Sequence, residues 1–274
     1  MMSPTDHPEP CDHVPPLLEF VNVTVIRDGK TVLDRITITV RHGEHIAILG
    51  PNGSGKSSFI RTVNRELYPV SIKNDGVIFR VRGKDVWDVF DLRSSFGVVS
   101  PDLQYAYTRH VTGREVILSG FFSSIGLFNH RVTPQMEERA DSIIRLLGIG
   151  HLKGRTMDTM SSGEARRFLI GRALVHRPES LILDEPTNSL DLHALHTFRR
   201  SLRSVAQSGV GIIMATHNLH DIIPEISRVI LMKEGRFILD GKKEEVLRDA
   251  HIGSLFNVPV MVREENGWYY ATGY

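Results

Sequence analysis

Residues 50–57 read Gly50-Pro51-Asn52-Gly53-Ser54-Gly55-Lys56-Ser57. This stretch matches G-x-x-x-x-G-K-[ST], the pattern of a loop that wraps phosphate groups. Its glycines let the backbone curl so that successive N–H groups point at one anion. An apolar strand is predicted over residues 45–49 and a helix from about Lys56, which places the positive end of the helix dipole at the same anion. A plain flexible turn is the alternative, but the strand–loop–helix context favours a nucleotide site.

The side chains that close this loop have distinct expected roles. Lys56 is expected to reach the β- and γ-phosphates of ATP, and the Ser57 hydroxyl is expected to hold Mg²⁺. The predicted cofactors are therefore ATP and Mg²⁺. The predicted nucleotide contacts in this segment are Gly50, Pro51, Asn52, Gly53, Ser54, Gly55, Lys56, Ser57 and Ser58.

Two carboxylates follow a second apolar stretch, residues 181–183. Asp184 at the end of such a strand can bind Mg²⁺, and Glu185 can act as the general base toward an attacking water. In isolation, an acidic pair that closes a strand is most often a solvated strand end. Behind a phosphate loop the functional interpretation is favoured.

The pattern along the chain predicts an α/β fold. Residues 17–26 and 32–40 are strand-like around the turn signal Asp28-Gly29 and predict a β-hairpin. Further short strands are predicted at 76–81, 95–99, 181–183 and 212–215, and helical spacing fills about 100–178 and 192–206. We therefore expect a mostly parallel sheet with helices on both faces, an N-terminal antiparallel β subdomain and a helical subdomain. The predicted boundaries are a tail at 1–16, an ATPase domain at 17–254 and an extension at 255–274.

Composition restricts the possible partners. The formal charge of the 274-residue chain is +1, so no strong field favours nucleic acid, and none is expected as a partner. The single cysteine, Cys11, permits no internal disulfide, which fits a reducing cytoplasm. The sequence contains no run of 18 apolar residues that would span a membrane.

Three further motifs are in register with the first two. Residues 160–164 read Met-Ser-Ser-Gly-Glu, residues 189–191 read Ser-Leu-Asp, and His217 ends the strand-like stretch that begins at Ile212. With the phosphate loop and the acidic pair, this order over residues 17–250 closely resembles the ATP-binding-cassette (ABC) ATPase family. The resemblance implies a phosphate-loop nucleotide hydrolase core with a helical signature subdomain. It also implies a dimer of two such chains around two MgATP.

The resemblance assigns roles to these residues. Ser161 and Gly163 would contact the γ-phosphate of ATP held by the second copy, Asp191 would link the two sites, and His217 would sense the γ-phosphate. Together with Lys56 and Glu185, His217 forms the expected catalytic set. Each residue also has a structural alternative: Ser161 with Glu164 makes a capping box, and Asp191 can cap the helix that follows it.

Two positions depart from the family pattern. The aromatic residue that commonly stacks on adenine corresponds to Arg27, whose guanidinium can also stack on a base; a solvated strand residue is the alternative. The usual glutamine after the strand at 95–99 corresponds to Pro101. Gln104, three residues later, is the candidate replacement as a Mg²⁺ ligand, and a surface residue is its alternative.

The apolar stretch from Val116 to Phe128 is rich in large side chains for a loop that faces water. In the family this region borders the groove that receives a cytoplasmic helix of a transmembrane permease, so a separate permease is the expected partner. The chain would then lie on the inner face of the cell membrane. Local similarity over Val111–Phe128 indicates importer ATPases for metal chelates or oxyanions such as molybdate. The alternative is a soluble ABC ATPase that drives assembly, like the iron–sulfur assembly ATPase, without a permease.

Residues 258–270, around the turn signal Asn266-Gly267, predict a C-terminal β-hairpin.

Overall fold

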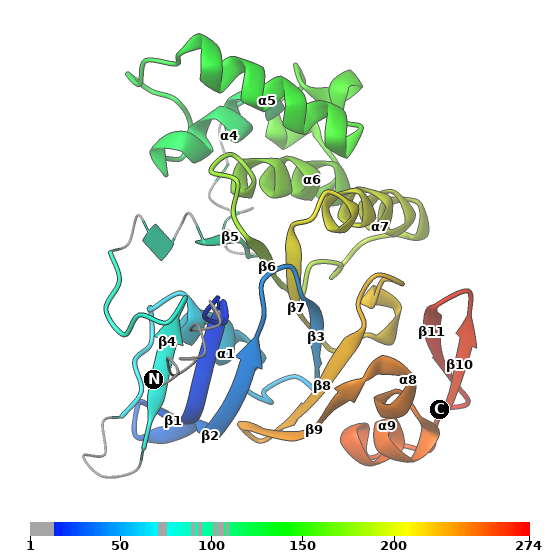
Figure 1. Cartoon of the computed structure of the whole chain (residues 1–274). Coiled ribbons are helices and arrows are strands. Elements are labelled where there is room, and N and C mark those ends of the chain that lie inside the picture. Colours follow the sequence, from blue (N-terminus) through cyan, green and yellow to red (C-terminus); the bar gives the residue numbers. More distant parts are fainter. Residues whose placement is uncertain are drawn as a thin grey trace, which may run out of the picture.

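The computed structural model describes residues 14–70, 76–88, 91–92, 95–100, 103, 107 and 110–274. Its central layer is a six-stranded sheet with the order β5-β6-β7-β3-β8-β9 (Figure 1). The strands are β3 (His45–Leu49), β5 (Phe96–Val99), β6 (Ser180–Asp184), β7 (Gly211–Thr216), β8 (Arg228–Lys233) and β9 (Arg236–Lys242). Neighbours from β5 to β8 run parallel, and only β9 is antiparallel to β8. The predicted mostly parallel sheet is confirmed.

The central strands are buried on both faces, which explains their continuous apolar sequences. Alternate residues of β3 enter different cores: Ile46 and Ile48 join one cluster, and Ala47 and Leu49 the other. The first cluster contains Phe59 from α1 (Lys56–Val63), and the second contains side chains from α6 (Ser162–Ala173) and α7 (Leu192–Gln207). Helices therefore cover both faces of the sheet, as expected.

A three-stranded antiparallel sheet of order β2-β1-β4 packs beside α1. Its strands are β1 (Leu18–Arg27), β2 (Lys30–Val40) and β4 (Ile78–Val81). Asp28 and Gly29 connect β1 to β2 with φ values of 51° and 74°, the positive pair that a type I′ hairpin requires. Phe20 of β1 meets Phe59 of α1 edge to face, with ring centroids 5.9 Å apart, and so joins this sheet to the core.

The helical subdomain comprises α4 (Gly113–Ser119), α5 (Pro134–Leu147) and α6, which lie above the sheet in Figure 1. Short 3-10 segments connect them: η1 (Gly120–Phe122), η2 (Gly150–Leu152) and η3 (Met157–Thr159). Gly113 is needed where α4 crosses α6, because a Cβ there would lie 2.5 Å from the Phe168 ring. This close packing holds the two helices as one unit.

The apolar stretch at 116–128 divides between core and surface. Val116, Ile117 and Leu118 are buried against α6, so for them the prediction of a partner surface is wrong. The sequence pattern could not distinguish the buried residues from the exposed ones, because α6, which covers the buried ones, begins some 45 residues later. Phe121 and Phe122 are half-buried, and Phe122 stacks on the His130 ring at 4.3 Å; Ile125 and Phe128 remain exposed.

The C-terminal region adds the 3-10 segment η4 (Leu219–Asp221), helices α8 (Lys243–Val246) and α9 (Asp249–Phe256), and strands β10 (Met261–Glu265) and β11 (Trp268–Thr272). The predicted hairpin is present: Asn266 and Gly267 have φ values of 53° and 81°, again the type I′ pair. The Tyr270 ring meets His220 of η4 at 4.9 Å, so the hairpin packs against the segment that follows β7.

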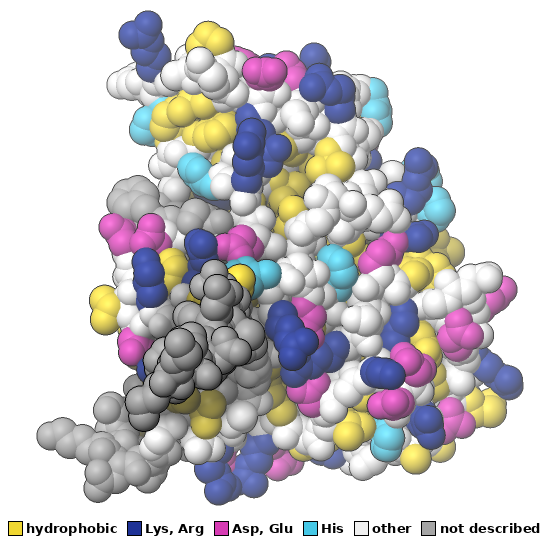
Figure 2. Space-filling model, in the orientation of Figure 1, with side chains coloured by type: hydrophobic (Ala, Val, Ile, Leu, Met, Phe, Trp, Pro, Cys, Tyr) yellow, Lys and Arg dark blue, Asp and Glu magenta, His cyan; other side chains and the backbone are white. Residues whose placement is uncertain are grey.

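The helices and the surface charge bear on how the molecule meets its surroundings. No helix in the described part of the chain is long and apolar enough to cross a membrane. Figure 2 shows basic and acidic side chains interspersed over the visible face, in keeping with a formal charge of +1. Residues 1–13 of the predicted tail, Pro101 and Gln104 lie outside the described residues.

Candidate functional site

The sheet brings the separate motifs to one edge. β3, β6 and β7 are parallel neighbours, so their carboxyl ends meet, and the loops that leave those ends carry the phosphate loop, the acidic pair and His217. Backbone hydrogen bonds join the three exits: Gly50 N–H donates to Thr216 O at 3.2 Å, and Glu185 N–H donates to Ala215 O at 2.8 Å. Ligands of open α/β sheets bind at such an edge.

The phosphate loop needs glycine at defined positions. A Cβ at Gly50 would lie 2.2 Å from Met232 O, and one at Gly55 would lie 2.9 Å from Val32 O. Gly53 and Gly55 also adopt φ values of +79° and +109°, which side-chain-bearing residues rarely adopt. The loop is thus clamped between β8 and β2 and leads directly into α1, whose first turn carries Ser57 and Ser58.

Lys56 lies inside this loop. Its side chain is only 4% exposed, and Nζ donates to Gly50 O at 2.9 Å and to Pro51 O at 3.0 Å. The same Nζ lies 3.4 Å from Glu185 Oε1. The loop therefore holds one buried cation against two of its own carbonyl oxygens and beside a carboxylate. A buried ammonium of this kind can form charge-assisted hydrogen bonds with phosphate oxygens.

Asp184 ends β6 with a buried, unpaired carboxylate oxygen. Its Oδ1 has no hydrogen-bond partner, while the Ser57 side chain hydrogen-bonds to the carboxylate. Burial raises the pKa of Asp184, and the neighbouring Glu185 raises it further, against the opposing effects of Ser57 and Lys56. A buried carboxylate oxygen without a donor, beside a serine hydroxyl, fits a hard divalent cation that takes oxygen ligands. The described residues contain no cluster of three or more His, Cys, Asp or Glu that would hold a metal alone.

The Glu185 carboxylate is surrounded by groups that favour its charged form. Burial opposes ionisation, but Asn188 Nδ2 donates to Oε2 at 2.6 Å, and Lys56 and His217 add positive charge, so the pKa of Glu185 lies below its ordinary value. His217 Nδ1 lies 3.3 Å from Glu185 Oε1 without forming a hydrogen bond. Glu185 is thus ionised at neutral pH and is available as a base.

Ser161 and Asp191 each cap a helix, as their structural alternatives predict. Ser161 Oγ accepts from Glu164 N–H at 3.3 Å while Glu164 Oε2 accepts from Ser161 N–H at 2.8 Å, which completes the capping box of α6. Asp191 Oδ1 accepts from Ala194 N–H at 2.8 Å at the start of α7. Gly163 permits the two helix starts to touch, since a Cβ there would lie 2.7 Å from the Ala194 Cβ. Ser161 and Asp191 are both exposed, so capping leaves them accessible, whereas Gly163 is buried.

Arg27 lies at the end of β1, in the hairpin whose β2 strand contacts Gly55 through Val32 O. Its side chain is half-exposed, and Nε lies 3.5 Å from the Asp28 carboxylate. The hairpin therefore brings Arg27 to the phosphate-loop side of the molecule without burying it.

Three contributing residues were not predicted from the sequence. Asn188 holds the Glu185 carboxylate, and Thr187 and Asp221 form a buried hydrogen bond beneath the same loop. Asn188 follows Glu185 at i+3 in a turn, where an amide can reach back to a side chain, and this spacing is the one signal that was available. Asp221 carries no comparable local signal, because its partner is 34 residues away.

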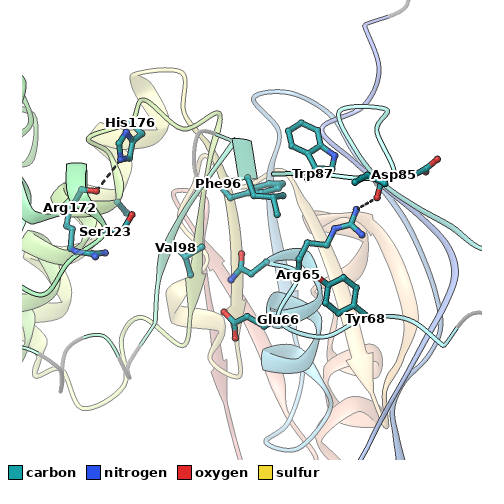
Figure 3. Close-up of a pocket in the computed structure, with 15 residues that line it drawn as sticks. Arg65, Glu66, Tyr68, Asp85, Trp87, Phe96, Val98, Ser123, Arg172 and His176 are labelled. Carbon is teal, nitrogen blue, oxygen red and sulfur yellow. Dashed lines mark hydrogen bonds between the residues drawn. The ribbon is translucent and has the colours of Figure 1, made fainter. Parts of the chain in front are cut away.

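A groove of 640 Å³ lies between the sheet core and the helical subdomain, with its two walls visible in Figure 3. Trp87, Phe96 and Val98 supply apolar surface, and Arg172 and His176 face them from the helical side. The other lining residues are Asn64, Arg65, Glu66, Tyr68, Asp85, Val86, Leu92, Gly120, Ser123 and Ala173. The Arg65 guanidinium is fixed 3.6 Å over the Phe79 ring and donates to Asp85 O at 3.3 Å. The rim exposes Tyr68 (65%) and Val86 (86%).

Comparison with known proteins agrees with this geometry. The family of ABC transporters matches residues 33–188. An uncharacterized ABC transporter ATP-binding protein of Bacillus subtilis is 32% identical over 250 residues, which cover 90% of this chain and 93% of that protein. A hemin import ATP-binding protein of Photobacterium damselae is 30% identical over 253 residues, covering 89% and 91% of the two chains.

Solved structures give the same result. The cbiO1 protein of Clostridium perfringens, part of the ABC transporter complex cbiONQ, superposes with a TM-score of 0.71 at 30% identity, covering 89% of this chain and 95% of that one. A metal-chelate type ABC transporter in an inward-facing conformation shares the fold, with a TM-score of 0.72 at 20% identity, covering 93% and 96%. The chain belongs to the ABC transporter family. It is an ATP-binding subunit of that family and an ATPase.

Proposed function

We propose that this ATPase powers a separate transmembrane permease that imports a metal chelate or an oxyanion such as molybdate. The hemin import relatives and the cbiO1 relative support a permease-coupled role, and the local similarity at 111–128 supports the cargo class. The observation that carries the coupling is the groove with an exposed apolar rim, which lies beside the sheet strand β5 and the helical subdomain. On this proposal the chain is cytoplasmic and peripheral, on the inner face of the cell membrane.

The chemistry at the sheet edge follows from the side chains there. The loop N–H groups and Lys56 hold the β- and γ-phosphates. An oxygen of the ionised Glu185 accepts a proton from water as that water attacks the γ-phosphorus. The bond from the γ-phosphorus to its bridging oxygen then breaks, and ADP and phosphate leave. The 3.3 Å distance between His217 Nδ1 and the Glu185 carboxylate supports the proposed contact of His217 with the γ-phosphate.

Ser57 and Asp184 are the residues that would hold Mg²⁺. At this position a bound Mg²⁺ would supply positive charge to offset the negative charge that develops on the phosphate groups. The unpaired Asp184 Oδ1 and the Ser57 hydroxyl beside it support this assignment. The role of Gln104 as a further ligand stays a prediction.

The proposed surface that meets the second copy includes the exposed Ser161 and Asp191, and the buried Gly163 would contribute through its backbone N–H. The accessible α6 N-terminus carries N–H groups and the positive helix end, a suitable environment for the γ-phosphate of a facing site. Gly163 also lets α6 pack closely against Ala194 of α7, so a larger residue at position 163 would push the two helix starts apart. We therefore infer that two chains close around two MgATP, each completing the other's site.

Arg27→Ala tests the proposed adenine contact. We expect affinity for ATP and GTP to fall alike, by about 0.5–2 kcal/mol, because a guanidinium stacked on a base reads the ring face and not its edge. Arg35→Ala removes the same charge from the same hairpin and serves as the matched control. The measurement is a fluorescence titration. Unchanged affinity in Arg27→Ala would mean that Arg27 is a solvated surface residue and does not contact adenine.

Permease docking is tested at two exposed apolar side chains, Val86 at the groove rim and Phe128 in the apolar stretch at 116–128. They are 86% and 73% exposed, whereas Phe121 and Phe122 are packed, so Val86→Asp and Phe128→Ser change the surface with less risk to the fold. We expect both variants to leave the membrane fraction of cells while basal ATP hydrolysis is retained, because buried apolar contacts dominate such interfaces. Tyr274→Ser, also an exposed aromatic, should stay with the membranes.

The location of the wild-type chain in its own cells distinguishes a permease-coupled ATPase from a soluble assembly ATPase. If it is entirely soluble in its own cells and cross-links to no membrane protein, the permease proposal is wrong and a soluble assembly ATPase is the remaining candidate. The groove would then receive a soluble partner.

A further inference from the structure

Asp221, at the end of η4, carries a buried carboxylate that joins two distant segments. The residue is only 2% exposed. Its Oδ1 accepts a hydrogen bond from Thr187 Oγ1 at 2.5 Å, and its Oδ2 accepts one from Thr216 Oγ1. Both carboxylate oxygens thus accept from threonine hydroxyls, one in the loop after β6 and one at the end of β7.

Each threonine is tied to a different part of the candidate site. Thr187 lies two residues after Glu185, and its carbonyl accepts from Leu190 N–H at 3.1 Å, one residue before Asp191. Thr216 precedes His217, and its carbonyl accepts from Gly50 N–H at 3.2 Å at the start of the phosphate loop. A movement of either threonine therefore displaces groups that meet the nucleotide.

Joining Thr187 and Thr216 through the buried carboxylate of Asp221 costs desolvation free energy. Burying a carboxylate against two neutral hydroxyls carries a desolvation penalty that a neutral pair avoids, and burial raises the pKa of Asp221. The charged groups that face it are Arg199, whose Nη2 donates to His220 O, and His217. A carboxylate does offer what a neutral side chain lacks, namely two acceptors in one rigid plane that fix two donors at once.

The C-terminal hairpin holds η4 in place from outside. The Arg199 guanidinium lies 4.8 Å from the Trp268 ring centroid, and Tyr270 packs against His220. Asp221 therefore lies between the packed hairpin and the candidate site.

We propose that Asp221 is a positioning residue for ATP hydrolysis, which sets the placement of His217 relative to Glu185 and to the loop that ends at Asp191. The proposal rests on the catalytic roles proposed above for Glu185 and His217. Asp221 is buried beneath the surface, and it acts through Thr187 and Thr216. ATP binding depends mainly on the phosphate loop, so the effect should fall on turnover and not on affinity.

The test removes the contact from the threonine side. Thr187→Val and Thr216→Val each delete one hydroxyl, and Thr187→Ser and Thr216→Ser restore it. We expect kcat for ATP to fall about 10- to 100-fold in the valine variants, because displaced catalytic groups cost that much, with KM little changed. The serine variants should keep most of the activity. Ser201→Ala, which removes a buried hydroxyl bonded to Leu147 O, should hydrolyse ATP normally.

A double-mutant cycle then assigns the effect to Asp221. Asp221→Ala combined with Thr187→Val should lower kcat no further than Asp221→Ala alone, because both changes break the same contact. Additive losses would contradict this, and so would valine variants that fold and keep kcat within about twofold of the wild type. Should Asp221→Ala fail to fold, the two valine variants decide alone. His217→Ala is measured in parallel: if it stays active, the proposed role of His217 fails, whereas an inactive His217→Ala beside active valine variants overturns only the role of Asp221.

Discussion

Lys56→Met should reduce ATP hydrolysis by about 100-fold or more, since each charge-assisted hydrogen bond to phosphate is worth about 1.5–3 kcal/mol. Methionine keeps most of the length and apolar surface of the buried side chain, so the change removes the charge with little loss of packing. The measurement is phosphate release by the purified chain, with affinity for ATP measured alongside.

The control for this variant is Lys153→Ala, which removes one positive charge from an exposed position of the helical subdomain. It should hydrolyse ATP as the wild type does. Lys56 also lies 3.4 Å from Glu185 Oε1, so its loss should raise the pKa of that carboxyl toward its ordinary value. Hydrolysis by a folded Lys56→Met at the wild-type rate would refute the assignment of the phosphate loop.

The sequence predicted the sheet edge well because the signals there are local. Each apolar strand runs directly into its functional residue, as β6 does at Asp184 and β3 at Gly50, and parallel pairing then brings those ends together. Capping is equally local: the Ser161–Glu164 box is present because both hydrogen bonds close within three residues. The turn signals Asp28-Gly29 and Asn266-Gly267 likewise predicted both hairpins, and the structure gives both turns the φ values of type I′.

The remaining features depend on contacts between residues far apart in the chain. Val116, Ile117 and Leu118 looked like a candidate partner surface, but α6 covers them. Asp221 gave no signal because its role arises only when β6 and β7 pair and bring Thr187 beside Thr216. The groove is formed by residues from the segments that follow α1 and β4, from β5 and from the helical subdomain, so no single stretch of sequence could predict it.

Glu185→Gln is expected to bind ATP, to hydrolyse it about 100-fold or more slowly, and to become a stable dimer in MgATP. Glutamine keeps the shape of the side chain, and its Oε1 can still accept from Asn188, but its neutral amide cannot take the proton of the attacking water. If each site is completed by Ser161 and Gly163 of the other chain, unhydrolysed ATP holds the two chains together. A ligand that binds only the dimer shifts the equilibrium toward it by mass action.

Size-exclusion chromatography with light scattering, with and without MgATP, measures this equilibrium. Glu138→Gln, which neutralises an exposed carboxylate in α5, is the matched control and should stay monomeric and active. A Glu185→Gln dimer that forms equally well without nucleotide contradicts the shared site.

The second variant separates the shared site from helix capping. Ser161→Arg in the Glu185→Gln background should abolish the dimer, because a bulky side chain would fill the space of the facing γ-phosphate. The substitution also removes an N-cap, which costs about 1 kcal/mol of helix stability on its own. Thr133→Arg removes the N-cap of α5, where Thr133 Oγ1 accepts from Met136 N–H at 3.4 Å, and controls for that loss. If both arginine variants lose the dimer equally, capping explains the effect; if only Ser161→Arg loses it, the α6 N-terminus contacts the nucleotide of the second chain.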